Sequence, residues 1–223
     1  MIRVENVEVF NFEGAIRGLR NPMNSWDKSD SFLCKGNDFD VCKSTSKFCP
    51  RMDEDFTEDV FCVGDADLTL MKKLYKAGTE HRKYLRQIFV SMDITAPLYW
   101  YKEMDTYKVG TVSNSCSTMH KIAAKEFEFD DFSCEHVMNM PLIFDIILEL
   151  NHYRRLYIKT KEKEYWWQMI QLLPSSYNQR RTITMTYENV VSMIKQRENH
   201  KLDEWREFVE MLKNLPYIKE ITE

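Results

Sequence analysis

Small polar residues gather between Gly110 and Ser117, where the chain reads Gly-Thr-Val-Ser-Asn-Ser-Cys-Ser. We predict a loop here. Such a loop is able to hold a phosphate through its backbone N–H groups. A capped turn needs the same residue types, so both interpretations stay open at this point.

Positive charges flank a strand-like segment farther along the chain. Arg180-Arg181 and Arg197 follow Leu173-Pro174 and lie on either side of the next predicted elements. An arginine there is able to grip a phosphate with two parallel N–H donors. His81 lies between an acid and a base, in Glu80-His81-Arg82, a setting that is more typical of a surface histidine than of a tuned catalytic one.

Three adjacent aromatic residues, Tyr99 to Tyr101, begin a segment that also carries several charges. Aromatic rings of this kind stack on flat cofactors or bases. They also fill cores when they lie on an amphipathic helix, and that packing role is the default interpretation.

The elements that position these residues follow from their hydrophobic spacing. We expect strands near residues 2–10, 87–94 and 178–186 and a helix that begins at Ala96-Pro97. Gly78 is suited to the left-handed turn after a helix end. Further helices are predicted from apolar residues at helical spacing, at residues 12–19, 65–77, 142–150, 165–173, 187–197 and 202–215. This order predicts an α+β fold, with a mixed sheet flanked by helices and a helical C-terminal portion.

The bulk composition is that of an ordinary globular protein. The 223 residues carry 31 basic and 35 acidic side chains, a net charge of −4, which does not resemble the basic footprint of a nucleic-acid-binding protein. We expect a single domain over residues 1–223, with an irregular cysteine-rich insertion at about residues 20–62. The N-terminus does not resemble a signal peptide and no segment resembles a membrane span, so we expect a cytoplasmic protein.

Four of the six cysteines lie between residues 34 and 62, and none forms a Cys-x-x-Cys pair. Their spacing matches no common zinc module. We therefore expect reduced thiols and no metal site.

Two stretches together resemble the flavin-dependent thymidylate synthases. In that family a Glu-His pair, a strand and an Ala-Pro helix start precede a signature. The signature reads Arg-His-Arg, two variable residues, Ser, one variable, Asn-Glu, one variable, Ser, one variable, Arg. This chain has Glu80-His81 and Ala96-Pro97 in that order. Counting forward from Ala96-Pro97, the signature falls on Thr106-Tyr107-Lys108, Thr111, Ser113-Asn114, Cys116 and Thr118.

The second stretch runs from Leu173-Pro174 through Arg197 to Leu202-Asp203-Glu204-Trp205. The family has a Leu-Pro, a strand, an Asn-bearing helix start, a helix that ends in Arg and a further helix. The distance from Pro174 to Arg197 is similar to the family's. The resemblance covers about residues 65–215.

The resemblance implies FAD as cofactor, a pyrimidine nucleotide as substrate and a homodimer or homotetramer. It implies cofactor binding by His81 and Lys108, and substrate binding by Arg197, Lys108, Ser113 and Asn114. Cys116 replaces a serine that lies near the nucleotide in the family, and a thiol there is suited to attack C6 of a pyrimidine. The alternative is a small residue that fills a turn.

Most signature side chains nevertheless differ from the family's. The losses remove charge-assisted contacts that are worth about 1.5–3 kcal/mol each. Two functions follow. One is FAD-dependent one-carbon or hydride transfer to a pyrimidine nucleotide, with an altered substrate. The other is a non-catalytic relative that acts as an oligomeric scaffold or nucleotide-binding protein.

Overall fold

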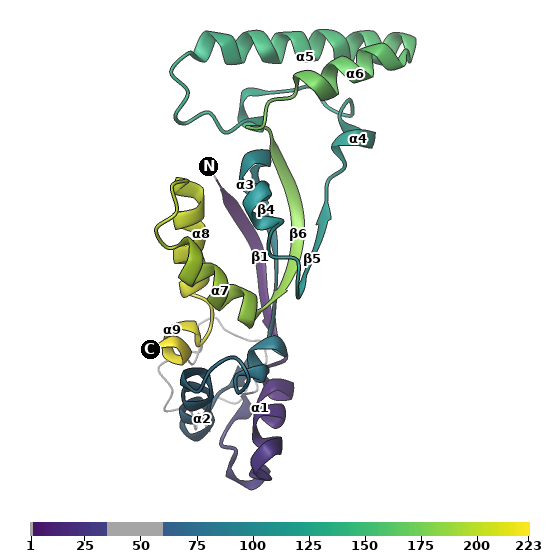
Figure 1. Ribbon diagram of the computed structural model, residues 1–223. Helices are drawn as coiled ribbons and strands as arrows, with labels where there is room; N and C mark the ends of the chain where they lie inside the picture. Colours follow the sequence, from purple (N-terminus) through teal and green to yellow (C-terminus); the bar gives the residue numbers. More distant parts are fainter. Residues whose placement is uncertain (1, 35–59) are drawn as a thin grey trace. The chain divides into compact units, whose positions relative to one another are not determined.

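The computed structural model describes residues 2–34 and 60–223, and it shows an α+β fold, as the sequence predicts. A four-stranded sheet has the strand order β1-β4-β6-β5, and a separate two-stranded sheet is formed by β2 and β3 (Figure 1). The strands are β1 (Arg3–Phe10), β2 (Phe32–Cys34), β3 (Val60–Cys62), β4 (Phe89–Pro97), β5 (Thr111–Ser115) and β6 (Asn178–Thr186).

The described α-helices are α1 (Phe12–Arg20), α2 (Asp65–Lys76), α3 (Leu98–Met104), α4 (Thr118–Lys121), α5 (Met140–Thr160), α6 (Lys163–Leu172), α7 (Tyr187–Arg197), α8 (Asp203–Lys213) and α9 (Ile218–Thr222). Helices α7, α8 and α9 form the helical C-terminal portion that the sequence predicts. Gly78 follows α2 with a φ of 107°, the left-handed conformation expected of it.

The chain divides into two compact units. The first comprises Met1–Val7, Ser91–Thr184 and Leu202–Trp205. The second comprises Glu8–Val90, Met185–Lys201 and Arg206–Glu223. Each is described by itself below.

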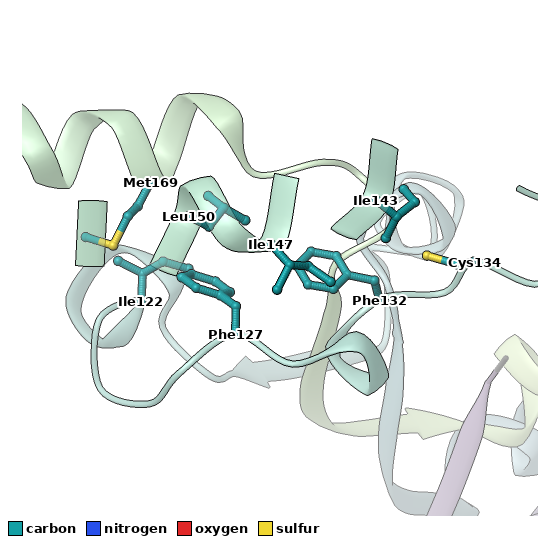
Figure 2. Packing of buried hydrophobic residues seen from close by; sticks show 8 residues of the cluster. All are labelled: Ile122, Phe127, Phe132, Cys134, Ile143, Ile147, Leu150 and Met169. Atoms are coloured by element: carbon teal, nitrogen blue, oxygen red, sulfur yellow. The ribbon is translucent and has the colours of Figure 1, made fainter. Parts of the chain in front are cut away.

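In the first unit, α5 and α6 lie side by side (Figure 1). Asn139 caps α5 by accepting a hydrogen bond from the backbone N–H of Leu142, and Pro141 lies in the first turn, where its missing donor costs nothing. One apolar face of α5 packs on the segment that precedes it and on Met169 of α6 (Figure 2). The buried members of this cluster are Ile122, Phe127, Phe132, Cys134, Ile143, Ile147, Leu150 and Met169.

Aromatic packing holds α3 in the same unit. Trp100 and Trp205 are both fully buried and stack with ring centroids 4.6 Å apart and an interplanar angle of 21°. The buried Tyr101 hydroxyl donates to the carbonyl oxygens of Ile94 and Gln179, at 2.7 and 3.0 Å. Two residues of the aromatic run therefore serve the core, in agreement with the packing interpretation.

The second unit is organised around a buried ion pair. Arg20, the last residue of α1, donates from Nε to Oδ1 of Asp67 in α2 at 2.6 Å. The two side chains are 5% and 0% exposed. Phe12 of α1 packs edge-on against Tyr187 and Tyr217, which adds an aromatic core to this unit.

The predicted loop at Gly110–Ser117 is wrong over most of its length, because residues Thr111–Ser115 form strand β5. The backbone N–H of Cys116 continues the pairing by donating to Arg180 of β6 at 2.9 Å. Thr111 and Val112 carry the β-branched character of a strand, but small polar neighbours conceal it.

The predicted insertion at residues 20–62 is described only in part. Its described residues form two 3-10 helices, Asn21–Met23 and Trp26–Lys28, and strands β2 and β3, which pair antiparallel. Cys34 and Cys62 are buried free thiols there, whereas Cys42 and Cys49 lie outside the described residues. Within the described ranges, no three His, Cys, Asp or Glu side chains are grouped so as to hold a metal ion.

None of the described helices has the length and hydropathy that crossing a bilayer requires.

Candidate functional site

Cys116 is held in place by two hydrogen bonds to β6. Its backbone N–H donates to the carbonyl of Arg180, and the side-chain amide of Gln179 donates to the Cys116 carbonyl at 2.8 Å. Gln179 is itself buried. The Cys116 side chain is exposed, whereas Cys134 in the same unit is buried. The thiol is therefore accessible on a fixed backbone.

The Cys116 thiol lines a pocket of about 290 Å³, which we call the Cys116 pocket. Four cationic side chains line it, contributed by Arg3, Lys121, Lys125 and Arg180. Asp131 is the one carboxylate among the described lining residues, and it pairs with Lys125. Ser117 and Thr118 add hydroxyl groups. Cations and hydroxyl donors around a hollow suit a phosphate or another anion.

Arg180 is oriented by a carboxylate on the neighbouring strand. Its Nη2 donates to Oδ2 of Asp93 in β4 at 2.7 Å. Asp93 also accepts from the Thr182 hydroxyl at 2.5 Å and from the Asn6 amide at 2.8 Å. These hydrogen bonds, the one from Thr182 first, hold the pKa of Asp93 well below its usual range. Because a guanidinium has five donors, Arg180 keeps N–H groups for a ligand.

A larger cavity of about 730 Å³ adjoins the Cys116 pocket, since Arg3, Thr95 and Asn178 line both. Its apolar walls come from Ile2 and from the segment that leads into α5, namely Phe129, Phe132, Cys134, Val137 and Met140. Asp130 and Glu135 also line this cavity. A cationic pocket beside a mostly apolar cavity is suited to a ligand with an anionic end and a ring.

Lys108 and Ser113 lie together at a separate and smaller hollow. Its volume is about 160 Å³, and Asp105 also lines it. Asn114, the neighbour of Ser113, is exposed and lines none of the pockets described above. The structure therefore brings together two of the predicted binding residues and leaves Cys116 in a different hollow.

His81 and Arg197 belong to the second unit. His81 lies in the turn after α2, where its backbone N–H donates to Gly78 at 3.0 Å. Arg197 is the last residue of α7 and is half-buried. In the same unit, Arg82 forms an ion pair with Glu188 at 2.7 Å. Their roles toward a ligand rest on the resemblance alone.

No sequence pattern indicated that Arg3, Lys121 and Lys125 contribute to this pocket. Arg3 lies far along the chain from the two lysines, and none of the three belongs to a motif. Strand β1 and the segment after β5 bring them to one pocket. Arg180 did carry a signal, because it belongs to the Arg-Arg pair that flanks the strand after Pro174.

No protein-family model matches this sequence, and no curated protein sequence matches it either. The solved structures that are similar to this chain include two of ThyX, the flavin-dependent thymidylate synthase of Helicobacter pylori, with FAD and dUMP. The first covers 100% of both chains at 13% identity, with a TM-score of 0.66. The second covers 97% of this chain and 98% of that chain at 15% identity, also with a TM-score of 0.66.

The chain has the ThyX fold. The structural match runs along the full length, so it extends beyond residues 65–215, to which the sequence resemblance is confined. At 13–15% identity it establishes the fold and leaves the chemistry to the residues themselves.

The side chains at the first three signature positions do not form the cationic clamp that FAD would need. The Thr106 hydroxyl donates to the carbonyl of Glu103 on its own helix at 2.7 Å. The Tyr107 ring lies 6.2 Å from that of Trp205, centroid to centroid. Lys108 is the one cation of the three, and the hollow that it lines is smaller than the roughly 300 Å³ expected of a ligand site. These positions do not fit FAD.

Proposed function

We propose that this protein binds a pyrimidine nucleotide and that the nucleotide phosphate lies in the Cys116 pocket. The observation that carries the proposal is the set of cations around Cys116 in a chain with the ThyX fold. The adjoining apolar cavity is large enough for the sugar and base.

The charges of the pocket support this orientation. Arg3, Lys125 and Arg180 each pair with a carboxylate, which fixes their positions but leaves N–H donors for a ligand. Lys121 is exposed, and among the described residues it takes part in no ion pair. A phosphate that enters the pocket would therefore meet one unneutralised cation and several prepositioned donors.

Cys116 lies where the ThyX signature has a serine, within the pocket proposed for the phosphate. The thiol is placed to contact the bound nucleotide. The resemblance suggests nucleophilic attack by this thiol on C6 of the pyrimidine, and that catalytic role requires the base to lie at the boundary between the two hollows, next to Cys116. Ser113, Asn114 and Lys108 stay proposed binding residues on the strength of the resemblance.

Titration calorimetry with dUMP tests the proposal. Lys121→Gln is expected to weaken dUMP binding about tenfold, because it removes one charge-assisted contact at an exposed position. Lys159→Gln, an exposed lysine of α5 that lines none of these pockets, is the matched control and should leave the affinity unchanged. No heat of binding in the wild-type protein, or equal affinities in both variants, would contradict the proposal.

Arg197→Ala provides a second arm of the same titration. If Arg197 contributes to nucleotide binding, as the resemblance suggests, the variant should bind dUMP about ten- to a hundred-fold more weakly. Lys195→Ala on the same helix is the control, since Lys195 is exposed. An unchanged affinity in Arg197→Ala would contradict the role that the resemblance suggests for Arg197.

Flavin-dependent transfer is the second candidate function, favoured by the match to a ThyX crystallised with FAD and dUMP. The protein is then expected to bind FAD, His81 and Lys108 being the proposed contacts. The absorbance spectrum of the purified protein distinguishes the candidates. The misfit at Thr106, Tyr107 and Lys108 predicts a colourless protein that takes up no FAD, and a yellow protein would favour flavin chemistry.

We also propose that the chain forms a homodimer or homotetramer. Phe144 and Leu148 of α5 are one helical turn apart and are 51% and 66% exposed, and Leu142 on another face of the helix is 52% exposed. Exposed apolar side chains of this size are typical of surfaces that other chains cover. Leu148→Gln is expected to shift the protein toward a monomer, because it places a polar group in the proposed interface. Light scattering is the measurement, and a wild-type mass near 26.8 kDa over a wide concentration range would contradict the proposal.

A further inference from the structure

We propose that a second site, between α4 and the junction of α5 with α6, binds a flat aromatic ring that carries a negative charge. We call it the Trp166 pocket. It has a volume of about 430 Å³, within the usual range for a small-molecule site. Its lining residues are Met119, His120, Ile122, Ala123, Tyr157, Lys161, Lys163 and Trp166.

The apolar walls of the Trp166 pocket are prearranged. The indole Nε1 of Trp166 donates to the carbonyl of Met119 in α4 at 3.1 Å, which ties the ring to that helix. Tyr157 and Trp166 also pack against the buried cluster that contains Ile122 and Met169. A rigid pair of aromatic walls binds a flat ring with little loss of side-chain entropy.

The charges that line the pocket are all of one sign. Lys161 and Lys163 line it together with His120, and no Asp or Glu is among its described lining residues. Glu162 and Glu164 are neighbours in sequence but do not line it. An anionic group on the ligand would therefore meet two lysines without a competing carboxylate.

Backbone geometry brings Lys161 to this place. Lys161 ends α5 in the left-handed conformation, with a φ of 62°, which is uncommon for a residue other than glycine or asparagine. Its ammonium lies 5.7 Å from the centre of the Tyr157 ring. The helix end thus sets a cation beside an aromatic wall, the pair of groups that an aromatic anion needs.

This site is distinct from the proposed nucleotide pocket. The two share Ile122 but none of their cations. The aromatic walls favour a ring of one or two fused cycles, and the lysines favour a carboxylate, sulfonate or phosphate attached to it. The proposal does not depend on nucleotide binding at Cys116.

Calorimetry with three probes tests the ligand class. 1-Naphthoate, a flat ring with a carboxylate, is expected to bind, whereas 1-naphthalenemethanol, which lacks the charge, and inorganic phosphate, which lacks the ring, are expected to bind at least about tenfold more weakly. The double variant Lys161→Gln/Lys163→Gln should weaken naphthoate binding by about tenfold or more. Lys159→Gln is the control, because it removes an exposed lysine near the end of α5 that does not line the pocket.

The location is tested by NMR of protein labelled with methyl-13C methionine. Met119 lines the Trp166 pocket, so its methyl signal, assigned with Met119→Leu, should shift when naphthoate is added. The methyl signal of Met104, which lines the smaller hollow at Lys108 and Ser113, should not shift. Lys121→Gln should leave naphthoate binding unchanged, which separates this site from the Cys116 pocket. The proposal would be overturned if naphthalenemethanol bound as tightly as naphthoate, if naphthoate did not bind, or if the Met119 methyl signal did not shift.

Discussion

Asp67→Asn is expected to lower the free energy of unfolding by about 3–5 kcal/mol at pH 7, because it leaves the buried Arg20 charge without a partner. Asp67 is fully buried, and its Oδ1 accepts from Arg20. Its Oδ2 accepts from the hydroxyls of Ser29 and Ser31 at 2.7 and 2.6 Å and from two backbone N–H groups. An asparagine amide would turn an NH₂ group toward some of these donors.

The stability that Asp67→Asn removes should depend on pH in a defined direction. Burial by itself raises the pKa of Asp67, but hydrogen bonds from Ser31, Ser29 and Arg20 and the charge of Arg20 outweigh it and hold the pKa below its usual value. A carboxyl group with a lowered pKa contributes stability that is fully present above its unfolded-state pKa of about 3.9 and is lost as the pH falls through the folded-state pKa. The difference in the free energy of unfolding between the wild-type protein and Asp67→Asn should therefore be constant near neutral pH and become smaller below about pH 4.

Urea unfolding followed by circular dichroism measures both effects. Asp65→Asn is the matched control, since Asp65 lies in the first turn of the same helix but is exposed, and it should cost no more than about 1 kcal/mol. Equal costs in the two variants would show that the buried pair does not stabilise the second unit.

Trp205→Ala is the other change with a large expected effect, a loss of about 3–5 kcal/mol. The side chain is fully buried and stacks on Trp100, so alanine would leave a cavity beside an aromatic ring that has lost its partner. Trp205→Phe keeps an aromatic ring in the stack and should cost clearly less. The near-ultraviolet circular dichroism of the stacked pair should disappear in the alanine variant.

The control for Trp205 is a tryptophan on the surface. Trp26 is 54% exposed, and Trp26→Ala should cost no more than about 1.5 kcal/mol, the value of its hydrogen bond to Asn21. A Trp205→Ala protein as stable as Trp26→Ala would mean that the stack does not hold α3 in the first unit.

The helices were largely predictable from local pattern. Helix α7 occupies residues Tyr187–Arg197, the range that its apolar spacing and its basic last turn predict. The Thr186 side chain caps this helix by accepting a hydrogen bond from the backbone N–H of Asn189. Helix α5 extends ten residues beyond the predicted Leu150, through a stretch whose charged face hides its apolar spacing. The predicted α+β class follows from this alternation of elements.

The pairing of distant strands was not predictable in the same way. Strand β5 is short, and four of its five residues are Thr, Ser or Asn, so its pairing with β6 and not its own composition decides its conformation. The same limit applies to the Cys116 pocket. Residues 3, 121, 125 and 180 acquire a common role only through the sheet and the segment after it.

The spacing of apolar residues does not identify a particular fold. The resemblance to the flavin-dependent thymidylate synthases did so. It led to Cys116 because that residue falls on a signature serine, and the structure places the thiol among cations. It also led to Lys108 and Arg197, whose surroundings give no independent support for a nucleotide.

Protection of Cys116 from alkylation tests nucleotide binding most directly. Cys116 is exposed, whereas Cys34, Cys62 and Cys134 are buried, so mass spectrometry can follow iodoacetamide addition at this one position. Saturating dUMP is expected to slow the modification of Cys116 in the wild-type protein, with much less protection in Lys121→Gln at the same dUMP concentration. If saturating dUMP does not change the alkylation rate at Cys116, the proposal that the nucleotide binds in the Cys116 pocket is contradicted.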